Sequence, residues 1–261
     1  MLDQEFKEKF IKLWQRYFPG AELPITFYYT EREYDAEMVP PAHKQSCLIC
    51  ELAQVRRGKS LLFDCEALGC GGAQRYLGFV QELRPKFEYF LSCGIEGELE
   101  GERYKKTPEL VLEFMKRMPV VKAPHPYIIF KRWDRLEELD NPEVVVFFAE
   151  GDVLAGLFTL ANFDRVDPEG VFTPFAAGCG SIVHYPYLES DEDNPRAVLG
   201  MFDVSARPCV GANVLSFAVP MVKFRSMVEN MEQSFLITGS WKKVQNRIEL
   251  AGRQPPGDPM E

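Results

Sequence analysis

The chain has 261 residues, of which 46% are hydrophobic and 26% are charged, as in ordinary globular proteins and unlike disordered ones. Its formal net charge of −9 disfavours nucleic acids and anionic membranes as partners, because both are bound through basic surfaces. The N-terminus is charged from its third residue, which argues against a secretory signal, and no apolar run is long enough for a membrane helix. We therefore expect a cytoplasmic protein that binds neither nucleic acid nor membrane.

The chain carries seven cysteines. Their odd number, together with the absence of an export signal, predicts reduced thiols rather than a disulfide framework. They are Cys47, Cys50, Cys65, Cys70, Cys93, Cys179 and Cys209.

The first part of the chain alternates predicted helices and strands. Apolar residues spaced on one helical face predict the first helix, which Pro19 and Gly20 end. A run of β-branched and aromatic residues predicts the strand that follows. The predicted elements are a helix over 2–18, a strand over 24–29, a helix over 47–57, a strand over 60–63, a helix from Ala73, a strand over 87–93 and a helix over 103–118 with Thr107 as N-cap and Pro108 at its first position.

The second part begins with an almost continuous apolar run over 142–148, which is typical of a central strand covered on both faces. Asp152 is the expected N-cap of the next helix. The remaining predicted elements are a helix over 152–162, strands over 171–173 and 198–204, a long helix opened by Pro220 and a short helix over 241–250.

Part of this order recurs about 109 residues later, which indicates an internal duplication. Gly69, Cys70, Gly71 and Tyr76 correspond to a second Gly-Cys-Gly turn with the same spacing to a tyrosine. The alternative is that any two strand–turn–helix units share glycines. The matched pairs are Leu52/Leu160, Ala53/Ala161, Arg57/Arg165, Phe63/Phe172, Gly69/Gly178, Cys70/Cys179, Gly71/Gly180 and Tyr76/Tyr185.

Several segments together resemble one protein family. They are Cys47-Leu-Ile-Cys50-Glu-Leu-Ala, Cys70-Gly-Gly-Ala-x-x-Tyr-Leu-Gly78, Leu160-Ala-Asn-Phe-Asp-Arg165, Pro174-Phe-Ala-Ala-Gly-Cys179 and Asp203-Val-Ser-Ala-Arg207. The chain resembles, from about residue 25 to residue 249, the uncharacterised ancient-conserved-region family also called domain of unknown function 169. The resemblance implies no activity and no catalytic residue, only that the glycine–cysteine turns matter.

The two Gly-Cys-Gly turns are the first candidate site. A glycine-rich turn between a strand and a helix directs backbone N–H groups and the positive helix end at one point, which suits an anion or a thiolate. A cysteine there is expected to be the most nucleophilic thiol of the chain. The alternative is a tight turn with a small buried thiol.

A second candidate is the group formed by Cys47, Cys50, Cys65 and Cys70, which invites a zinc or iron–sulfur interpretation. The spacing argues against it, because Cys47 and Cys50 lie on a predicted helix and the second pair is separated by four residues rather than two. We therefore predict buried thiols and no bound metal.

Two further groups are weaker candidates. His184 lies five residues after Cys179, so a Cys–His contact is not assured, and a hydrogen-bonded histidine at a helix surface is the expected outcome. Asp203, Ser205 and Arg207 could face the cleft, where Arg207 would hold a carboxylate or phosphate. The alternative is that an Asp–Arg pair braces a loop.

We predict an α/β fold with mixed sheets and packed helices. It is divided into an N-terminal helix (1–20), two pseudo-equivalent halves (21–135 and 136–250) and a disordered tail (251–261).

The predicted function is binding of a small anionic ligand or cofactor, of unidentified chemistry, between the halves. The alternatives are a cysteine-dependent enzyme or redox protein using Cys70 or Cys179, and an iron–sulfur or zinc protein using the four cysteines of the second candidate. The sequence leaves the oligomeric state and any catalytic residue open. The predicted ligand-binding residues are Cys70, Gly71, Gly72, Cys179, Gly180, Ser181 and Arg207.

Overall fold

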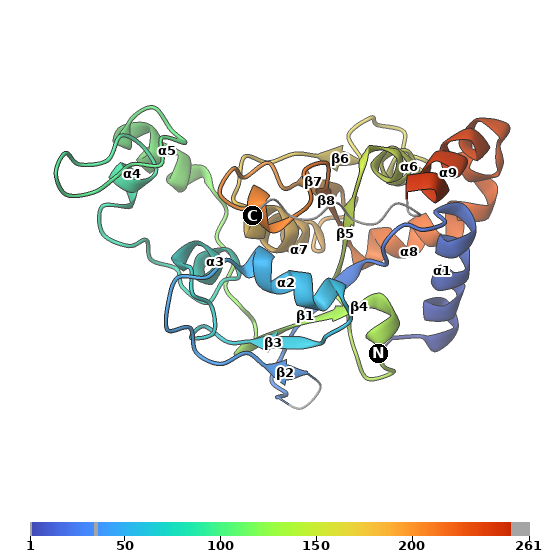
Figure 1. Cartoon of the computed structure of the whole chain (residues 1–261), viewed down its shortest axis with the longest axis horizontal. Coiled ribbons are helices and arrows are strands. Elements are labelled where there is room, and N and C mark those ends of the chain that lie inside the picture. Colours follow the sequence, from blue (N-terminus) through green and yellow to red (C-terminus); the bar gives the residue numbers. More distant parts are fainter. Residues whose placement is uncertain (1, 34–35, 252–261) are drawn as a thin grey trace.

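The computed structural model describes residues 2–33 and 36–251, and that part of the chain forms one mixed eight-stranded sheet with helices on both faces (Figure 1). The strand order is β2-β3-β4-β1-β5-β8-β7-β6, so the predicted α/β class is confirmed. The strands are β1 (Ile25–Thr30), β2 (Glu37–Met38), β3 (Leu61–Phe63), β4 (Tyr127–Arg132), β5 (Val144–Ala149), β6 (Val171–Phe172), β7 (Ala197–Gly200) and β8 (Leu215–Pro220).

The antiparallel pair β1–β5 joins the two sides of the sheet, with Ile25 opposite Val146. Every residue of β5 is buried, which confirms the prediction of a central strand covered on both faces. Its side chains alternate between the faces, because successive residues of a strand point in opposite directions. Val145 and Phe147 therefore belong to one hydrophobic core, and Val146 and Phe148 to the other.

Four helices build the first core, seen at the right of Figure 1 around α1, α8 and α9. Aromatic rings dominate it: Phe224 lies 4.9 Å from Phe10 between ring centroids, and Trp14 lies 4.3 Å from Phe18. Each buried aromatic residue removes a large apolar area from water, so this core carries much of the stability. The four helices are α1 (Gln4–Tyr17), α6 (Gly151–Ala161), α8 (Met221–Asn230) and α9 (Gly239–Ala251).

The second core lies on the other face of the sheet and contains most of the cysteines. Its helices are α2 (Leu48–Arg56), α3 (Gly71–Tyr76) and a continuous run from Gly178 that passes through a π-helical turn, η2 (Gly180–His184), into α7 (Tyr185–Glu189). The apolar face of α2 is provided by Ile49, Leu52 and Val55, which are fully buried or nearly so. This packing fixes the N-terminal end of α2 beside the loop that follows β7.

A smaller lobe, with α4 (Phe87–Phe90) and α5 (Pro108–Arg117), extends away from the sheet at the left of Figure 1. The predicted cap of α5 is confirmed: the Thr107 side chain accepts the Leu110 amide, and Pro108 is the first helical residue. The predicted strand over 87–93 is wrong. Its aromatic residues resemble those of a strand, but the segment bonds to itself, with the Phe90 amide donating to the Lys86 carbonyl.

Two other details differ from the sequence analysis. The N-cap of α6 is Glu150 rather than Asp152, whose carboxylate instead forms a 3.0 Å ion pair with Arg247. The predicted disordered tail begins at residue 251, but Ala251 is the last residue of α9. The rest of the predicted tail, 252–261, lies outside the described residues. Short 3₁₀ turns complete the described chain: η1 (Trp133–Arg135), η3 (Arg207–Cys209), η4 (Met231–Gln233) and η5 (Phe235–Ile237).

The two sides of the sheet have the same order of pairing. Each consists of an edge strand parallel to the next one, followed by two antiparallel pairings toward the centre. The sequence match aligns β3 with β6, however, and these strands differ in position, since β6 is at an edge and β3 lies between β2 and β4. The internal duplication, and the half boundaries drawn from it, therefore stay predictions.

Within the described residues, no helix combines the length and apolar character needed to span a membrane.

Candidate functional site

Three cysteines from two distant parts of the chain meet beside the second core. Cys47 is the N-cap of α2, Cys50 lies in its first turn, and Cys209 ends the η3 turn. Their three sulfur atoms all lie within 4.8 Å of one another. We call Cys47, Cys50 and Cys209 the thiol triad.

Within the thiol triad, Cys50 and Cys209 form a disulfide across a sequence separation of 159 residues. The expectation of reduced thiols alone is therefore wrong. That expectation rested on the number of cysteines, whereas the pairing depends on where the chain after β7 lies relative to α2, which only the tertiary structure determines. Cys50 is exposed, and Cys47 and Cys209 are half-buried.

The predicted group of Cys47, Cys50, Cys65 and Cys70 is not the one that the fold gathers. Among the described residues, the group close enough to share one metal ion contains Cys209 in place of the last two. Cys65 lies on the segment after β3, and burial, followed by the charge of Asp64, raises the pKa of its thiol. Cys65 and Cys70, which are near Cys50 in sequence, are thus not part of the group, and Cys209, 159 residues after Cys50, is.

The disulfide is held by a well-defined loop, residues 201–214, which we call the Cys209 loop. The Arg207 guanidinium donates to four carbonyl groups, all within this loop: those of Met201 (3.3 Å), Gly211 (3.2 Å), Ala212 (2.5 Å) and Val214. Arg207 therefore uses its donors to fix the shape of the loop. An anion would have to compete with these carbonyl groups for the guanidinium.

Asp203 attaches the Cys209 loop to the rest of the protein. Its Oδ2 accepts the Gly178 amide at 2.9 Å, and its Oδ1 accepts the Ser205 amide at 3.0 Å and the Ser205 hydroxyl at 2.8 Å. Asp203 and Arg207 thus brace the loop separately rather than as an ion pair. The loop also covers Gly178 sterically, because a Cβ there would stand 3.2 Å from both Ala206 and Met201.

The second Gly-Cys-Gly turn is packed against protein. Cys179 has helical dihedral angles (φ −64°, ψ −31°) and is buried. A Cβ on Gly180 would stand 2.7 Å from the Tyr76 ring. The buried Ser181 hydroxyl donates to the Gly178 carbonyl at 2.9 Å and accepts the Met201 amide at 3.3 Å.

The first turn is open by comparison. Cys70 is extended (φ −129°, ψ 123°) and forms the N-cap of α3. A Cβ on Gly71 would meet nothing within 4 Å, and one on Gly72 would meet only the Cys70 sulfur, at 3.5 Å. The two turns therefore differ in backbone conformation, although an internal duplication predicts that they share one: Cys179 already belongs to a helix, whereas Cys70 precedes one.

The Cys179 thiol lies in the same core as Cys47 and Cys70. Burial raises the pKa of this thiol well above its usual range, and negative charge at Cys70 and Cys47 adds to the shift. In the observed conformation Cys179 is thus held as a neutral, covered thiol. A nucleophilic role for Cys179 would require its cover to move.

His184 is buried rather than at a helix surface as predicted. It ends the π-helical turn, with its ring 5.4 Å from the Tyr76 ring and 5.1 Å from the Tyr185 ring, between centroids. Burial lowers its pKa, and the carbonyls of Tyr76 and Pro119 oppose that shift. The histidine is therefore a neutral, aromatic-packed group.

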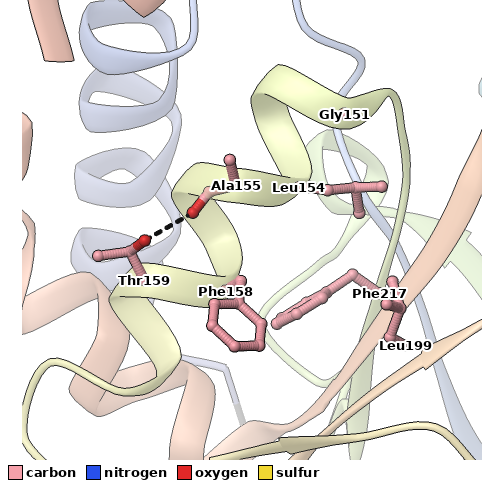
Figure 2. Close-up of a pocket in the computed structure, with 7 residues that line it drawn as sticks. All are labelled: Gly151, Leu154, Ala155, Phe158, Thr159, Leu199 and Phe217. Atoms are coloured by element: carbon pink, nitrogen blue, oxygen red, sulfur yellow. Dashed lines mark hydrogen bonds between the residues drawn. The ribbon is translucent and has the colours of Figure 1, made fainter.

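A pocket of about 290 Å³ lies at a different place, between α6 and the strands β7 and β8 (Figure 2). Phe158 and Phe217 face each other across it, and Thr159 donates to the Ala155 carbonyl at 2.8 Å on its helical wall. The predicted ligand-binding residues do not line this pocket. Its lining consists of Gly151, Leu154, Ala155, Phe158, Thr159, Leu199 and Phe217.

Comparison with known proteins identifies one family. The model of the family called domain of unknown function 169, described as an uncharacterised ArCR, matches residues 22–230. Neither the curated proteins nor the solved structures contain a significant match to the chain.

Proposed function

The chain belongs to the family called domain of unknown function 169. Since that family is described as uncharacterised, we propose from the chain's own geometry that it is a thiol–disulfide exchange protein. The observation that carries the proposal is a disulfide in which one sulfur, that of Cys50, belongs to an exposed residue at the start of a helix. The substrate class is a dithiol.

The reaction is a two-step exchange. A thiolate of the substrate attacks the Cys50 sulfur, a mixed disulfide forms, and Cys209 leaves as a thiolate that takes up a proton. The second substrate thiol then attacks the mixed disulfide as a thiolate and releases Cys50. The substrate loses two electrons and becomes a disulfide, while the Cys50–Cys209 bond is reduced to two thiols.

The surroundings of Cys50 suit this role. The sulfur lies in the first turn of α2, where the positive helix end favours the negative charge that develops during exchange. Cys209 lies in a loop whose shape Arg207 maintains, so that the cysteine keeps its place within the loop after the bond is broken. Re-formation of the bond by an external disulfide would complete the cycle.

Dithiothreitol is the probe for the test. Oxidised protein is mixed with reduced dithiothreitol, free thiols are trapped by rapid alkylation, and the peptides containing Cys50 and Cys209 are quantified by mass spectrometry. We expect one equivalent of dithiothreitol to be oxidised as the bond opens. The double variant Cys47→Ser/Cys50→Ser, in which no disulfide can form within the triad, should abolish this reaction. Cys93→Ser, which removes an exposed cysteine outside any disulfide, is the matched control and should leave it unchanged.

Two outcomes would overturn the proposal. One is that Cys50 and Cys209 remain fully alkylatable after treatment with excess diamide, a strong thiol oxidant. The other is that Cys47→Ser/Cys50→Ser oxidises dithiothreitol as fast as the wild type.

A second candidate is a soft-metal site built from the reduced thiol triad. Four thiolates around zinc, with Zn–S bonds of ~2.3 Å, have sulfurs about 3.8 Å apart, and the triad sulfurs already lie within 4.8 Å. Three thiolates would leave the fourth position for water or a ligand. Uptake of one Zn²⁺ by the reduced protein, lost in Cys47→Ser, Cys50→Ser and Cys209→Ser, would favour this function.

The anionic-ligand site predicted at the Gly-Cys-Gly turns stays a proposal. Only the first turn leaves space beside its backbone, so Cys70, Gly71 and Gly72 are the residues on which it now depends. Binding of inorganic phosphate that is weakened by Gly72→Val would support it.

A further inference from the structure

We infer that the disulfide of the thiol triad moves from Cys50–Cys209 to Cys47–Cys50, and that this move releases the Cys209 loop and uncovers Cys179. The inference rests on the proposed function, because it requires an exchange-competent disulfide. It adds a regulatory role for Cys47, which the exchange with substrate does not use.

The exchange within the triad needs no outside oxidant or reductant. The Cys47 thiolate attacks the Cys50 sulfur, the Cys47–Cys50 bond forms, the Cys50–Cys209 bond breaks, and Cys209 receives the proton that Cys47 has lost. The attacking sulfur is in place, since all three sulfurs lie within 4.8 Å of one another. The number of disulfides stays constant.

The new bond is compatible with the backbone of α2. Residues three apart at a helix end have Cα atoms about 5 Å apart, which is within the range that disulfides span. Cys47 and Cys50 stand at this separation, because Cys47 is the N-cap of the helix and Cys50 its third residue. α2 therefore need not unfold to accommodate the bond.

The two positions of the disulfide differ in what they constrain. Cys50–Cys209 ties α2 to a loop 159 residues away, whereas Cys47–Cys50 closes a short ring within one helical turn. Moving the bond thus removes the covalent attachment of the Cys209 loop and creates no other attachment in its place.

The Cys209 loop is built to move as a unit. The Arg207 guanidinium binds carbonyl groups that all belong to the loop, so these bonds hold its shape whether or not it is docked. The polar docking contacts are fewer: the bond from the Gly178 amide to Asp203 and the bond from the Met201 amide to the Ser181 hydroxyl. The apolar contacts are the packing of Met201 and Ala206, both buried in the second core, against Gly178, and the packing of Val210 and Val214 against the same core.

Cys179 follows Gly178 in the helix and is buried. Burial raises the pKa of its thiol, negative charge at Cys70 and Cys47 adds to the shift, and Asp203 of the loop is close enough for its charge to contribute as well. Undocking of the loop would therefore expose the start of the helix and the Cys179 thiol together. The position of the disulfide controls whether the protein presents a second reactive thiol.

The test compares two single variants that fix the disulfide in each position. Oxidised Cys209→Ser can form only Cys47–Cys50 within the triad, and oxidised Cys47→Ser only Cys50–Cys209. Iodoacetamide labelling of Cys179 is followed by mass spectrometry, and hydrogen exchange of the Gly178 and Met201 amides reports the docking of the loop. We expect labelling to be at least about tenfold faster in oxidised Cys209→Ser, with loss of protection at both amides.

Wild-type protein provides the decisive comparison. After incubation with a catalytic amount of 2-mercaptoethanol, some molecules should contain the Cys47–Cys50 bond. When the sample is then labelled with iodoacetamide and the intact protein is fragmented in the mass spectrometer, the label on Cys179 should be found in these molecules.

The inference is overturned if oxidised Cys209→Ser contains no Cys47–Cys50 bond, or if Cys179 is labelled equally in the two variants. Failure of the proposed function is distinguishable, since in that case wild-type protein does not oxidise dithiothreitol at all. A wild type that oxidises dithiothreitol but never forms Cys47–Cys50 refutes the relocation alone.

Discussion

The carboxylate of Asp203 accepts the backbone amide of Gly178 at 2.9 Å, and this bond fastens the loop that carries Cys209 to the start of the helix that carries Cys179. The two residues are 25 positions apart in sequence, and Gly178 precedes β7 whereas Asp203 follows it. The bond also satisfies an amide at a helix N-terminus, which has no partner within the helix. One side chain thus links loop docking to helix capping.

Asp203→Ala should lower the free energy of unfolding by about 1–3 kcal/mol, because a part-buried amide loses a charged acceptor. Asp203→Asn keeps an oxygen acceptor and should lose less than half of that. Urea unfolding of both variants under reducing conditions measures the difference without the disulfide. Equal losses in the two variants would show that the charge or the shape of the carboxylate, rather than this hydrogen bond, is what matters.

Gly200→Ala should be strongly destabilising, because the added Cβ would stand 2.2 Å from the Ser181 hydroxyl oxygen. Overpacking of this kind costs about 1–3 kcal/mol. Gly71→Ala is the matched control: its Cβ meets nothing within 4 Å at the first residue of α3, so the change should be neutral or stabilise by up to ~1 kcal/mol. Thermal unfolding of both variants checks the pair, and a stable Gly200→Ala would contradict the tight packing around Ser181.

Features encoded locally could be predicted from the sequence. The apolar run over 142–148 is long enough and continuous enough to indicate a doubly covered strand, and β5 has that place. Thr107 followed by Pro108 is sufficient to predict the residue at which α5 begins. In both cases the information lies within a few consecutive residues.

Features that depend on distant contacts could not be predicted. Cys209 has no local signal, since what makes it a partner of Cys50 is the course of the chain after β7. The strand expected over 87–93 failed for a similar reason: whether aromatic residues form a strand depends on a neighbouring strand, and this segment lies away from the sheet. The two-residue strand β2 is defined by its pairing with β3 alone.

Lys131 and Asp140 form a buried ion pair on the far side of β4, with Nζ 2.9 Å from Oδ1 and both side chains about 2% exposed. Asp140 also accepts the Tyr28 hydroxyl and the Glu137 amide. Lys131→Met should lower the free energy of unfolding by about 3–5 kcal/mol, because it leaves a buried carboxylate without its counter-charge.

The double variant Lys131→Met/Asp140→Leu should recover part of the loss measured for Lys131→Met. Chemical unfolding of the single and double variants gives the coupling between the two sites. If the losses of stability in the two single variants simply add up in the double variant, the two charges do not stabilise each other in the folded state.

Glu143 makes the stability depend on pH. Burial raises the pKa of its carboxyl group, and the Tyr29 amide, which donates to it at 3.0 Å, opposes the shift. A raised pKa in the folded state means that the folded protein holds this proton more tightly than the unfolded one. The contribution of Glu143 is therefore fully present below its unfolded pKa of about 4.3 and is lost as the pH rises through the folded value.

Glu143→Gln keeps an oxygen acceptor for the Tyr29 amide but removes the ionisation. We expect the variant to gain stability relative to the wild type as the pH is raised from 4 to 7, and urea unfolding across this range measures the gain. The exposed Glu102→Gln is the control and should show no such trend. A constant difference between Glu143→Gln and the wild type would contradict the raised pKa.

Loss of the disulfide should weaken the whole fold. A disulfide that spans 159 residues removes so much freedom from the unfolded chain that the entropic contribution approaches ~5 kcal/mol, and measured values are typically about 2–4 kcal/mol. Oxidised Cys209→Ser should therefore be about 2–4 kcal/mol less stable than oxidised wild type, and reduction of both proteins should remove most of this difference. The Cys47–Cys50 bond cannot compensate, because the ring it closes is too small to restrict the unfolded chain appreciably.

Denaturant unfolding of both proteins with and without reductant measures this difference in stability. A wild type whose stability is insensitive to reductant would mean that α2 and the Cys209 loop are held together by packing alone, and the covalent link would then add no stability.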